Sequence, residues 1–347
     1  MSIVHSNNRN PNNNLIIRSE NLKKWFEVRE SFLSSLLRSQ SKNFIKAVDG
    51  ISIDIKEGEI FAIVGESGCG KTTLGRLILQ VEKLTDGKMF FKNNDIDLMK
   101  PQQIKNLKTK IQMIFQDPYG SLNSTMNTKE IISEPLKIHK IYNSMKEEED
   151  KVIQAMKDVG LTPVEDYLKR YPHELSGGQR QRVVIAAALV LDPELLIADE
   201  PVSMLDVSIR GQILKLLTEI RREKNITILL ITHNLAVARQ ISDRIAVVYL
   251  GKIVETGPSR LILQNPKHPY TKALVSVVPN TDPSKNKKKI ILKGEIPSPI
   301  NLPIGCRFHP RCPFTIEKCR QNEPELDQIS PNQSVACLRV NEIDDLI

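Results

Sequence analysis

Three short, mostly apolar runs stand out along the chain, and each is followed at once by polar residues. The runs are "IFAIV" (60–64), "LLIA" (195–198) and "ITILLIT" (226–232), and they lead into "GESGCGKTT", "DEP" and "HN". Continuous apolar runs of this length are typical of strands buried on both faces of a parallel sheet. Ligands gather beyond the carboxyl ends of such strands, so we expect the three polar segments to converge on one site.

The segments between these runs have helical spacing. In 146–161, the apolar residues that fall on one helical face, and are therefore predicted to be core, are Val152, Ile153, Met156 and Val159. A strand is expected near 15–17, and strands alternate with helices from Ala47 onward. This alternation predicts an α/β fold with a largely parallel sheet, in a main domain covering 15–262.

Both ends of the chain differ from this domain in pattern. Residues 1–14 are polar and rich in asparagine, and we expect them to be disordered. After about residue 262 the chain becomes rich in proline and contains four of its five cysteines. Residues 263–347 are therefore predicted to form a separate, loop-rich appendage.

Composition limits the class of protein. The 347 residues exceed one typical domain, and 40% hydrophobic with 26% charged residues is typical of a soluble globular protein. The longest apolar run, 183–191, is far shorter than the ~20 residues that span a bilayer, and the polar N-terminus does not resemble a signal peptide. We expect the chain to stay in the cytosol. Its formal net charge of +8 admits nucleic acid, nucleotides or an anionic membrane as partners without choosing among them.

The segment after the first strand matches the phosphate-binding pattern G-x-x-x-x-G-K-[ST]. Its glycines let backbone N–H groups approach phosphate oxygens, and the following helix adds its positive N-terminal end. Lys71 is placed for the β- and γ-phosphates, and the Thr72 hydroxyl for Mg²⁺. The predicted nucleotide-binding residues of this loop are Gly65, Glu66, Ser67, Gly68, Cys69, Gly70, Lys71, Thr72 and Thr73.

The other two strand ends carry candidate catalytic groups. Asp199 is the expected second contact to Mg²⁺, and Glu200 is a candidate general base that polarises the attacking water. His233, at the end of the third strand, could contact the γ-phosphate. The alternative for each residue is an ordinary structural or solvated strand end.

A second potential anion site lies about a hundred residues further along the chain. Ser176, Gly177 and Gly178 offer a hydroxyl and backbone N–H groups at the start of a long apolar helix. The alternative is an ordinary helix cap with flexible glycines. The string "LSGGQ" (175–179), between a phosphate loop and an Asp-Glu strand end, resembles the signature of the ATP-binding-cassette (ABC) family.

Further segments match the same family in order over 15–262. Gln116 in "FQDP" resembles the Q-loop, "SMLD" (203–206) the D-loop and His233 the switch histidine, while Phe26 (or Trp25) lies at the A-loop position that stacks on adenine. The resemblance implies a RecA-like parallel sheet core with a helical subdomain at about 119–190.

The resemblance also implies that ATP is bound between two chains. The Walker site of one subunit would face the signature and D-loop of its partner, which are Ser176, Gly177, Gly178, Gln179 and Asp206. The implied catalytic residues are Glu200, His233 and Gln116, and the implied Mg²⁺ ligands are Thr72, Gln116 and Asp199.

The appendage narrows the family. "NPKHPYTKALVSVVP" and "GEIPSPINLPIGCRFHPRC" resemble the C-terminal extension of oligopeptide/dipeptide importer ATPases, in their F-type second subunit. The implied protein is a peripheral ATPase on the cytoplasmic face of the membrane. It would pair with a homologous ATPase, two permease subunits and an extracytoplasmic solute-binding protein, and would power uptake of peptides or a related solute such as oligosaccharides. A soluble ABC ATPase that acts on nucleic acid or ribosomes is the alternative; on the importer reading no nucleic-acid partner is expected.

Four cysteines are clustered in the appendage: Cys306, Cys312, Cys319 and Cys337. A disulfide is not expected in a reducing cytosol. The spacing lacks the C-x₂-C element usual for zinc, and four thiolates also suit a [4Fe–4S] cluster. The resembled extension binds such a cluster, which makes it our first expectation; zinc and inert buried thiols are the alternatives.

Overall fold

The computed structural model describes residues 14–28, 43–278 and 289–343. Apart from Asn14, the expected disordered tail at 1–14 lies outside the described residues.

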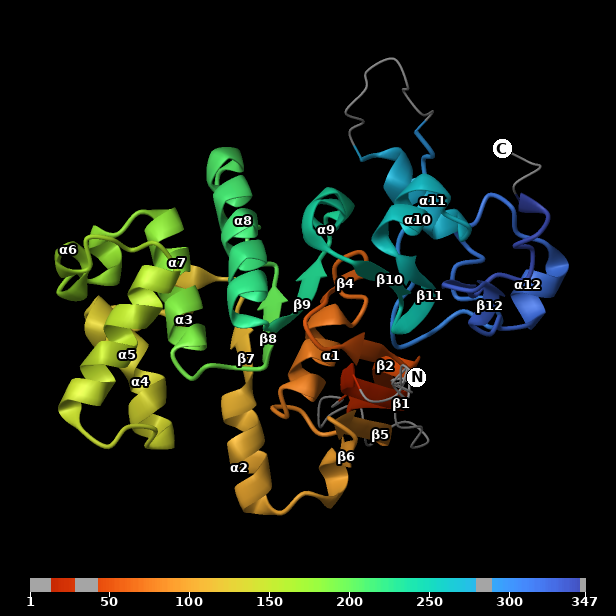
Figure 1. Cartoon of the computed structure of the whole chain (residues 1–347). Coiled ribbons are helices and arrows are strands. Elements are labelled where there is room, and N and C mark those ends of the chain that lie inside the picture. Colours follow the sequence, from red (N-terminus) through yellow and green to blue (C-terminus); the bar gives the residue numbers. More distant parts are fainter. Residues whose placement is uncertain (1–13, 29–42, 279–288, 344–347) are drawn as a thin grey trace, which may run out of the picture.

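An eight-stranded sheet forms the centre of the molecule (Figure 1), in the order β12-β13-β11-β10-β4-β9-β8-β7. Its parallel strands are β4 (Ile60–Val64), β7 (Ile111–Ile114), β8 (Leu195–Asp199), β9 (Thr227–Thr232) and β10 (Arg244–Tyr249). The antiparallel strands at the other edge are β11 (Lys252–Pro258), β12 (Asp327–Ser330) and β13 (Gln333–Val335). The three strands predicted from apolar runs are thus β4, β9 and β8, side by side and parallel, and their carboxyl ends meet at one edge as expected.

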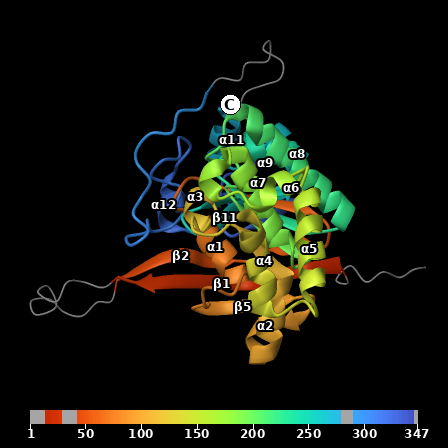
Figure 2. The same cartoon turned by 90° about the vertical axis from the view of Figure 1, so that its left-hand side faces the viewer.

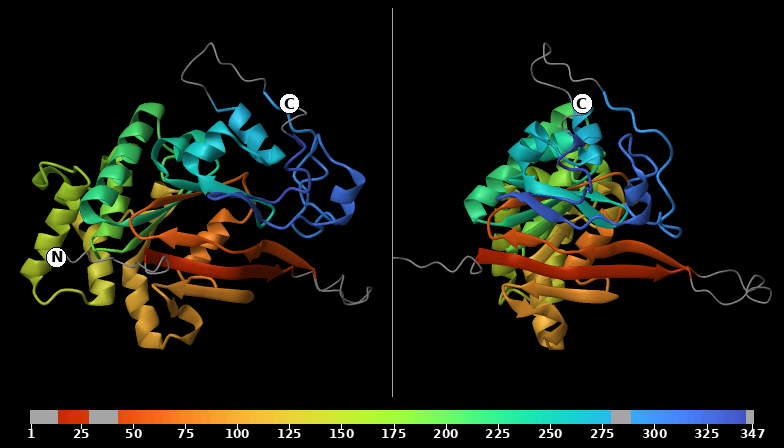
Figure 3. Two further views of the ribbon diagram at one scale, coloured as in Figure 1. Left: turned by 45° about the vertical axis from the view of Figure 1, so that its right-hand side comes forward. Right: turned by 90° about the vertical axis from the view of Figure 1, so that its right-hand side faces the viewer.

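A second sheet lies against one face of the first (Figure 3), with the order β2-β1-β5-β6 and β3 paired to β1. Its strands are β1 (Leu15–Glu27), β2 (Phe44–Ile51), β3 (Asp54–Lys56), β5 (Asp86–Phe91) and β6 (Asn94–Asp95). Helix α1 (Lys71–Ile78) contributes to the apolar core between the sheets. Alternate residues of β4 enter this core, such as Phe61 and Ile63, while Ile60 and Ala62 enter the core on the other face.

Helices cover the remaining faces. The helices beside the sheets are η2 (Ile96–Leu98), α2 (Pro101–Lys110), α8 (Val207–Lys224) and α9 (Leu235–Ile241). A helical group stands at the β7 end of the large sheet (Figures 1 and 2) and consists of α3 (Pro118–Ser121), α4 (Thr128–His139), α5 (Met145–Asp158), α6 (Glu165–Leu168), η3 (Pro172–Glu174) and α7 (Gly177–Leu189). Val152, Met156 and Val159 are fully buried and Ile153 half-buried against the same core, as their helical spacing predicts.

The C-terminal extension continues the main sheet instead of forming a separate appendage. Helix α10 (Ser259–Gln264) spans the expected boundary after residue 262, and α11 (Pro269–Ser276) and α12 (Glu317–Gln321) follow within the extension. Strand β13 pairs with β11, and Tyr270 and Phe308 are buried in the core of the large sheet. The expectation of a separate unit is therefore wrong, because apolar residues of the extension complete the core of the main domain. Among the described residues, no helix is long and apolar enough to cross a membrane.

Candidate nucleotide-binding and catalytic site

Two glycines at the ends of the loop between β4 and α1 leave no room for a larger residue. A Cβ on Gly65 would lie 2.2 Å from the carbonyl oxygen of Val248, and one on Gly70, which has φ 102°, would lie 1.9 Å from that of Ala47. Gly68 also has positive φ, but a Cβ there would meet no atom within 4 Å. The loop is thus pressed against neighbouring strands at both ends and open in its middle, where phosphate oxygens could approach the backbone.

Lys71 begins α1 and closes this loop from inside. Its side chain is buried, and Nζ donates to the carbonyl oxygens of Gly65 at 2.8 Å and Glu66 at 2.9 Å. Thr72 and Thr73 follow in the first turn of α1, half-buried, and Ser67 is exposed. The ammonium group is therefore held at the centre of the cradle, where an anion would meet it.

Asp199, at the end of β8, provides a fitting group for a metal cation. Its carboxylate is buried, and Oδ1 has no hydrogen-bond partner among the described residues. Burial raises the pKa of Asp199, while a hydrogen bond with the Thr72 side chain acts in the opposite direction. A hydroxyl and an unpaired carboxylate oxygen are ligands that Mg²⁺ prefers, so these residues fit the ion expected here.

Three predicted catalytic residues meet directly at the same edge. Glu200 Oε1 lies 2.7 Å from His233 Nδ1, and Glu200 Oε2 accepts a hydrogen bond of 3.2 Å from Gln116 Nε2. Glu200 has φ 47°, a conformation that a non-glycine residue adopts only under constraint. Its N–H donates to the carbonyl of Ile231 on β9, which fixes this turn. The geometry thus directs one carboxylate at a histidine and an amide, a suitable arrangement for orienting water.

The signature segment forms a well-capped helix start in a different part of the fold. Ser176 Oγ accepts from the N–H of Gln179 at 3.3 Å, and Gln179 Oε1 accepts from the N–H of Ser176 at 2.9 Å. Gly178 lies against Ile209 of α8, since a Cβ there would be 2.8 Å from that side chain. Asp206 is exposed at the start of α8.

Within one chain this segment and the phosphate loop belong to different packing units. Helix α7 packs on α4, α5 and β7, whereas α1 packs on β8, β9 and β2. One chain thus presents two candidate anion sites, at the starts of α1 and α7, that are supported by different elements (Figure 1).

The two aromatic candidates for adenine stacking are neighbours on β1. Both rings are half-buried, and a cation lies over each: Lys24 Nζ is 4.8 Å from the centroid of Phe26, and Lys46 Nζ is 4.5 Å from that of Trp25. The Trp25 indole N–H also donates to Asp49 at 2.9 Å. Because successive residues of a strand face opposite sides, only one of the two rings can face a given ligand.

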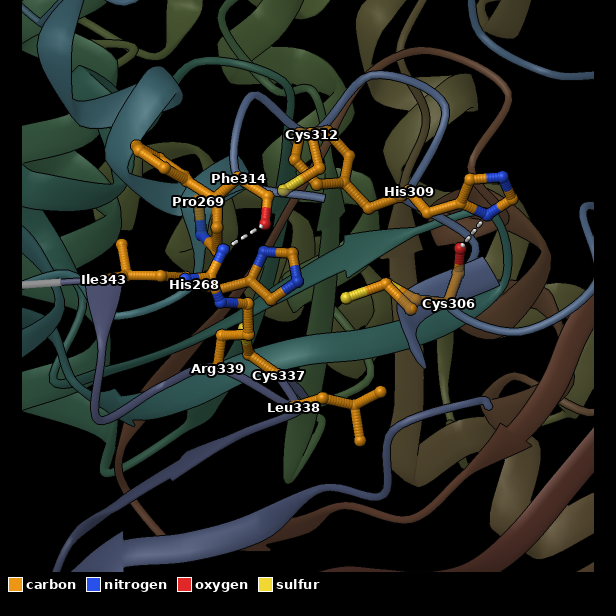
Figure 4. Close-up of a pocket in the computed structure, with 12 residues that line it drawn as sticks. His268, Pro269, Cys306, His309, Cys312, Phe314, Cys337, Leu338, Arg339 and Ile343 are labelled. Atoms are coloured by element: carbon orange, nitrogen blue, oxygen red, sulfur yellow. Dashed lines mark hydrogen bonds between the residues drawn. The ribbon is translucent and has the colours of Figure 1, made fainter. Parts of the chain in front are cut away.

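The four cysteines of the extension line one pocket, together with the buried His268. Figure 4 labels Cys306, Cys312 and Cys337 in this pocket. All four cysteines are free thiols, and burial raises the pKa of Cys306 to about 11 and of Cys312 to about 12. Within the described residues, however, no three His, Cys, Asp or Glu side chains are arranged to hold a metal ion. Four thiols gathered in one pocket are the donors that an iron–sulfur cluster uses. Their arrangement, however, gives no direct support to the expected cluster.

Two residues of the extension contact the phosphate loop, which no sequence pattern indicated. Arg311 forms a bidentate ion pair with Glu66, and the Tyr270 hydroxyl accepts a hydrogen bond of 2.9 Å from the N–H of Glu66. Both residues lie in the two extension segments that carry the family resemblance, yet neither was a site candidate. Local patterns do not reveal contacts between segments so distant in the chain.

The geometry defines a class of protein. A phosphate loop follows the central strand β4, the carboxylates Asp199 and Glu200 lie at the end of β8, and a second capped helix start lies at Ser176. An ABC-type ATPase has this set of features. The ABC transporter family model matches residues 48–203. Two solved cassettes are similar: the dimeric ATP-binding cassette MJ0796 bound to ADP and Pi, at 28% identity and TM-score 0.60, covering 70% of this chain and 99% of that one, and cbiO1 from Clostridium perfringens, at 29% identity and TM-score 0.61, covering 73% and 92%.

The particular family follows from the full-length relatives and the extension. The oligopeptide/dipeptide transporter C-terminal region model matches residues 254–319. The oligopeptide transport ATP-binding protein AppF of Bacillus subtilis is 46% identical, covering 94% of this chain and 98% of that protein. OppF of Salmonella typhimurium is 45% identical, covering 95% and 97%, and the dipeptide transport protein DppF of Haemophilus influenzae is 42% identical, covering 95% and 98%. The chain belongs to this family of ABC ATPases, and the nucleic-acid alternative is not favoured.

Proposed function

We propose that this chain hydrolyses ATP to power uptake of oligopeptides or dipeptides through a membrane ABC importer, on whose cytoplasmic face it is a peripheral subunit. The observation that carries the proposal is the match over almost the whole chain to peptide-transport ATP-binding proteins, including the C-terminal region that marks the oligopeptide/dipeptide group. Other solutes, such as oligosaccharides, are outcomes of the test below.

The nucleotide site is assigned to the edge where β4, β8 and β9 end. The loop 65–70 and the first turn of α1 would hold the phosphates, with Lys71 moving from its carbonyl partners to the β- and γ-phosphates. Mg²⁺, which neutralises phosphate charge when bound, would be held by Thr72, Asp199 and Gln116. Phe26 would stack on the adenine ring.

Glu200 is assigned the role of orienting the attacking water and accepting its proton. Its short contact with His233 and its hydrogen bond with Gln116 support this role, because both hold the carboxylate at the edge where the γ-phosphate would lie. His233 would contact the γ-phosphate and report its presence to the rest of the site.

The second anion site is assigned to the partner subunit's nucleotide. The dimeric state of the MJ0796 cassette supports pairing of two cassettes. We propose that the pair is head-to-tail, so that the 176–179 segment and Asp206 of one chain close over ATP on the other. We propose a homologous ATPase as the partner, two permeases as membrane subunits and an extracytoplasmic binding protein that delivers the solute. Closure on ATP and opening after hydrolysis would then drive the permeases by a population shift.

A [4Fe–4S] cluster is assigned to the pocket lined by the four cysteines of the extension, on the ground that four thiols gather there. Iron and acid-labile sulfide are measured after anaerobic purification, with a Cys312→Ser variant as control. About four iron and four sulfide per chain support the assignment, whereas zinc without iron, or no metal, refutes it.

Uptake is the direct test of transport. The gene is deleted in its own organism, and accumulation of labelled di- and oligopeptides is compared with that of labelled oligosaccharides. We expect peptide uptake to fall and to return with the wild-type gene but not with Glu200→Gln. Unchanged peptide uptake together with lost oligosaccharide uptake would refute the peptide assignment while leaving the importer intact.

A further inference from the structure

We propose that Arg311 of the C-terminal extension is a positioning residue for nucleotide binding, which acts by fixing the Glu66 segment of the phosphate loop. The inference deepens the proposed function and rests on it, since it assumes that this loop binds ATP. Glu66 lies in the loop itself, whereas Arg311 follows it by 245 residues and comes from a region otherwise expected only to hold a metal centre.

The contact between the two side chains has the geometry of a strong ion pair. Arg311 Nη1 lies 2.7 Å from Glu66 Oε2, and Nη2 lies 3.2 Å from Oε1. The arginine side chain is only 9% exposed and the glutamate side chain 27%. Parallel hydrogen bonds between a guanidinium and a carboxylate fix orientation as well as distance, so the pair restricts how Glu66 can move.

Glu66 is held at its backbone too. Its N–H donates to the Tyr270 hydroxyl at 2.9 Å, and its carbonyl oxygen accepts from Lys71 Nζ at 2.9 Å. The Cys69 N–H also donates to this carbonyl oxygen, at 3.4 Å, and two of the other three contacts come from the extension. The third comes from the lysine assigned to the phosphates, so the position of Glu66 bears directly on where that ammonium group rests.

The support is anchored in the core and is therefore stiff. Tyr270 is fully buried, and its ring centroid lies 4.9 Å from that of Tyr249 and 5.5 Å from that of Phe308. The Arg311 guanidinium lies 5.9 Å from the Tyr249 centroid. A closely packed aromatic cluster resists displacement, so the extension can transmit a fixed position to the loop.

A second contact from the same short segment reaches the other side of the loop. Arg307 pairs with Asp49 of β2 and donates to the carbonyl oxygen of Leu250 at 2.6 Å. The neighbouring Gly251 donates to the carbonyl oxygen of Cys69 at 3.0 Å. Residues 307–311 thus touch the phosphate loop directly at Glu66 and indirectly through the β10–β11 turn.

The expected effect is on affinity. Without the ion pair the loop would spend less time in the geometry that binds phosphate, and the apparent Kd rises in inverse proportion to that fraction. We expect Arg311→Met, which keeps most of the apolar stem, to weaken MgATP binding about tenfold, or ~1.4 kcal/mol. In the assembled transporter the KM for ATP should rise similarly while kcat stays within about twofold, because no group assigned to the chemistry is altered.

The test measures MgATP binding to the purified full-length chain by calorimetry. Arg320→Met is the matched control, since Arg320 lies in the same extension, is 54% exposed and pairs only weakly with Glu317 at 3.9 Å. We expect wild-type affinity for this control and an intermediate affinity for Arg311→Lys, which keeps the charge but loses the fork. If Arg311→Lys binds MgATP as weakly as Arg311→Met, the positive charge alone is insufficient and both parallel hydrogen bonds are required.

A double-mutant cycle separates positioning from general loss of structure. If Arg311 acts through Glu66, then Arg311→Met combined with Glu66→Met should bind no more weakly than the weaker of the two single variants. Multiplied losses, or an equal fall in kcat and kcat/KM, would overturn the proposal. Where Arg311→Met fails to fold, Arg311→Lys decides on its own: weaker MgATP binding with kcat retained supports the inference, and wild-type affinity refutes it.

Lys71→Ala distinguishes this inference from the site assignment on which it rests. If Lys71→Ala abolishes MgATP binding while Arg311→Met binds within twofold of wild type, the site stands and the role of Arg311 is refuted. If Lys71→Ala binds as tightly as wild type, the nucleotide site itself is misassigned.

Discussion

Replacing Glu200 with glutamine separates binding of ATP from its hydrolysis. The glutamine has nearly the same shape and keeps one acceptor oxygen, so it can hold one of the two contacts that join the wild-type residue to His233 and Gln116. It loses the negative charge and the ability to accept a proton from water. General base catalysis contributes about 10²–10⁴-fold, which raises the activation free energy by ~2.7–5.4 kcal/mol when it is removed.

The assay compares ATP turnover by the assembled transporter with MgATP binding by the same preparation. We expect kcat to fall by about 10²–10⁴-fold and Kd to change by less than about threefold, because Glu200 is not assigned to the phosphates themselves. Glu219→Gln on α8 is the control, since that side chain is 42% exposed and its partner, Lys215, is 3.7 Å away. A kcat within threefold of wild type would refute the assignment of Glu200, and a lost affinity would move its role from catalysis to binding.

The remaining predictions concern the loop, the adenine contact and an exposed ion pair. Gly70→Ala should abolish MgATP binding measured by calorimetry, because the added Cβ would lie 1.9 Å from a carbonyl oxygen of β2 at φ 102°; retained affinity would show that the loop can rearrange. Phe26→Ala should weaken ATP binding about tenfold, or ~1.4 kcal/mol, and Trp25→Ala should weaken it much less. A larger loss of affinity in Trp25→Ala than in Phe26→Ala would assign adenine stacking to Trp25. Partial burial raises the pKa of Glu194, but its ion pairs with Lys110 and Lys92 lower that pKa more, so the net shift is downward. The ionised Glu194 therefore stabilises the fold above the ordinary carboxyl pKa, and this stabilisation is lost as the pH falls through the lowered pKa of the folded state. Glu194→Gln should therefore reduce the acid dependence of unfolding between about pH 5 and pH 3, and an unchanged acid dependence would contradict that.

The central strands and the residues at their ends could be predicted because both signals are local. A continuous apolar run such as Ile60–Val64 has one stable location, the middle of a parallel sheet, and the chemistry that follows it must lie at the sheet edge. Glu200 and His233 follow the neighbouring strands β8 and β9, so the strand pattern alone brings them together, whereas Gln116 follows β7 and was identified through the family resemblance.

The role of the extension could not be predicted because it depends on distant partners. Strands β12 and β13 have only four and three residues, too few for a sequence to show the alternation that marks a strand. Only the pairing of β13 with β11, and of β12 with β13, shows that they complete the main sheet. The contact of Arg311 with Glu66 likewise joins residues whose local sequences show no complementarity. The four cysteines line one pocket, but neither their spacing nor the pocket identifies a metal.

The central claim is that this chain is the ATPase of a peptide importer, and co-purification tests it most directly. The tagged chain is isolated from membranes of its own organism after mild detergent extraction, and the proteins that accompany it are identified by mass spectrometry. The account predicts two permeases, a homologous ATPase and an extracytoplasmic peptide-binding protein. Recovery only from the soluble fraction, with ribosomes or DNA in place of permeases, would contradict it.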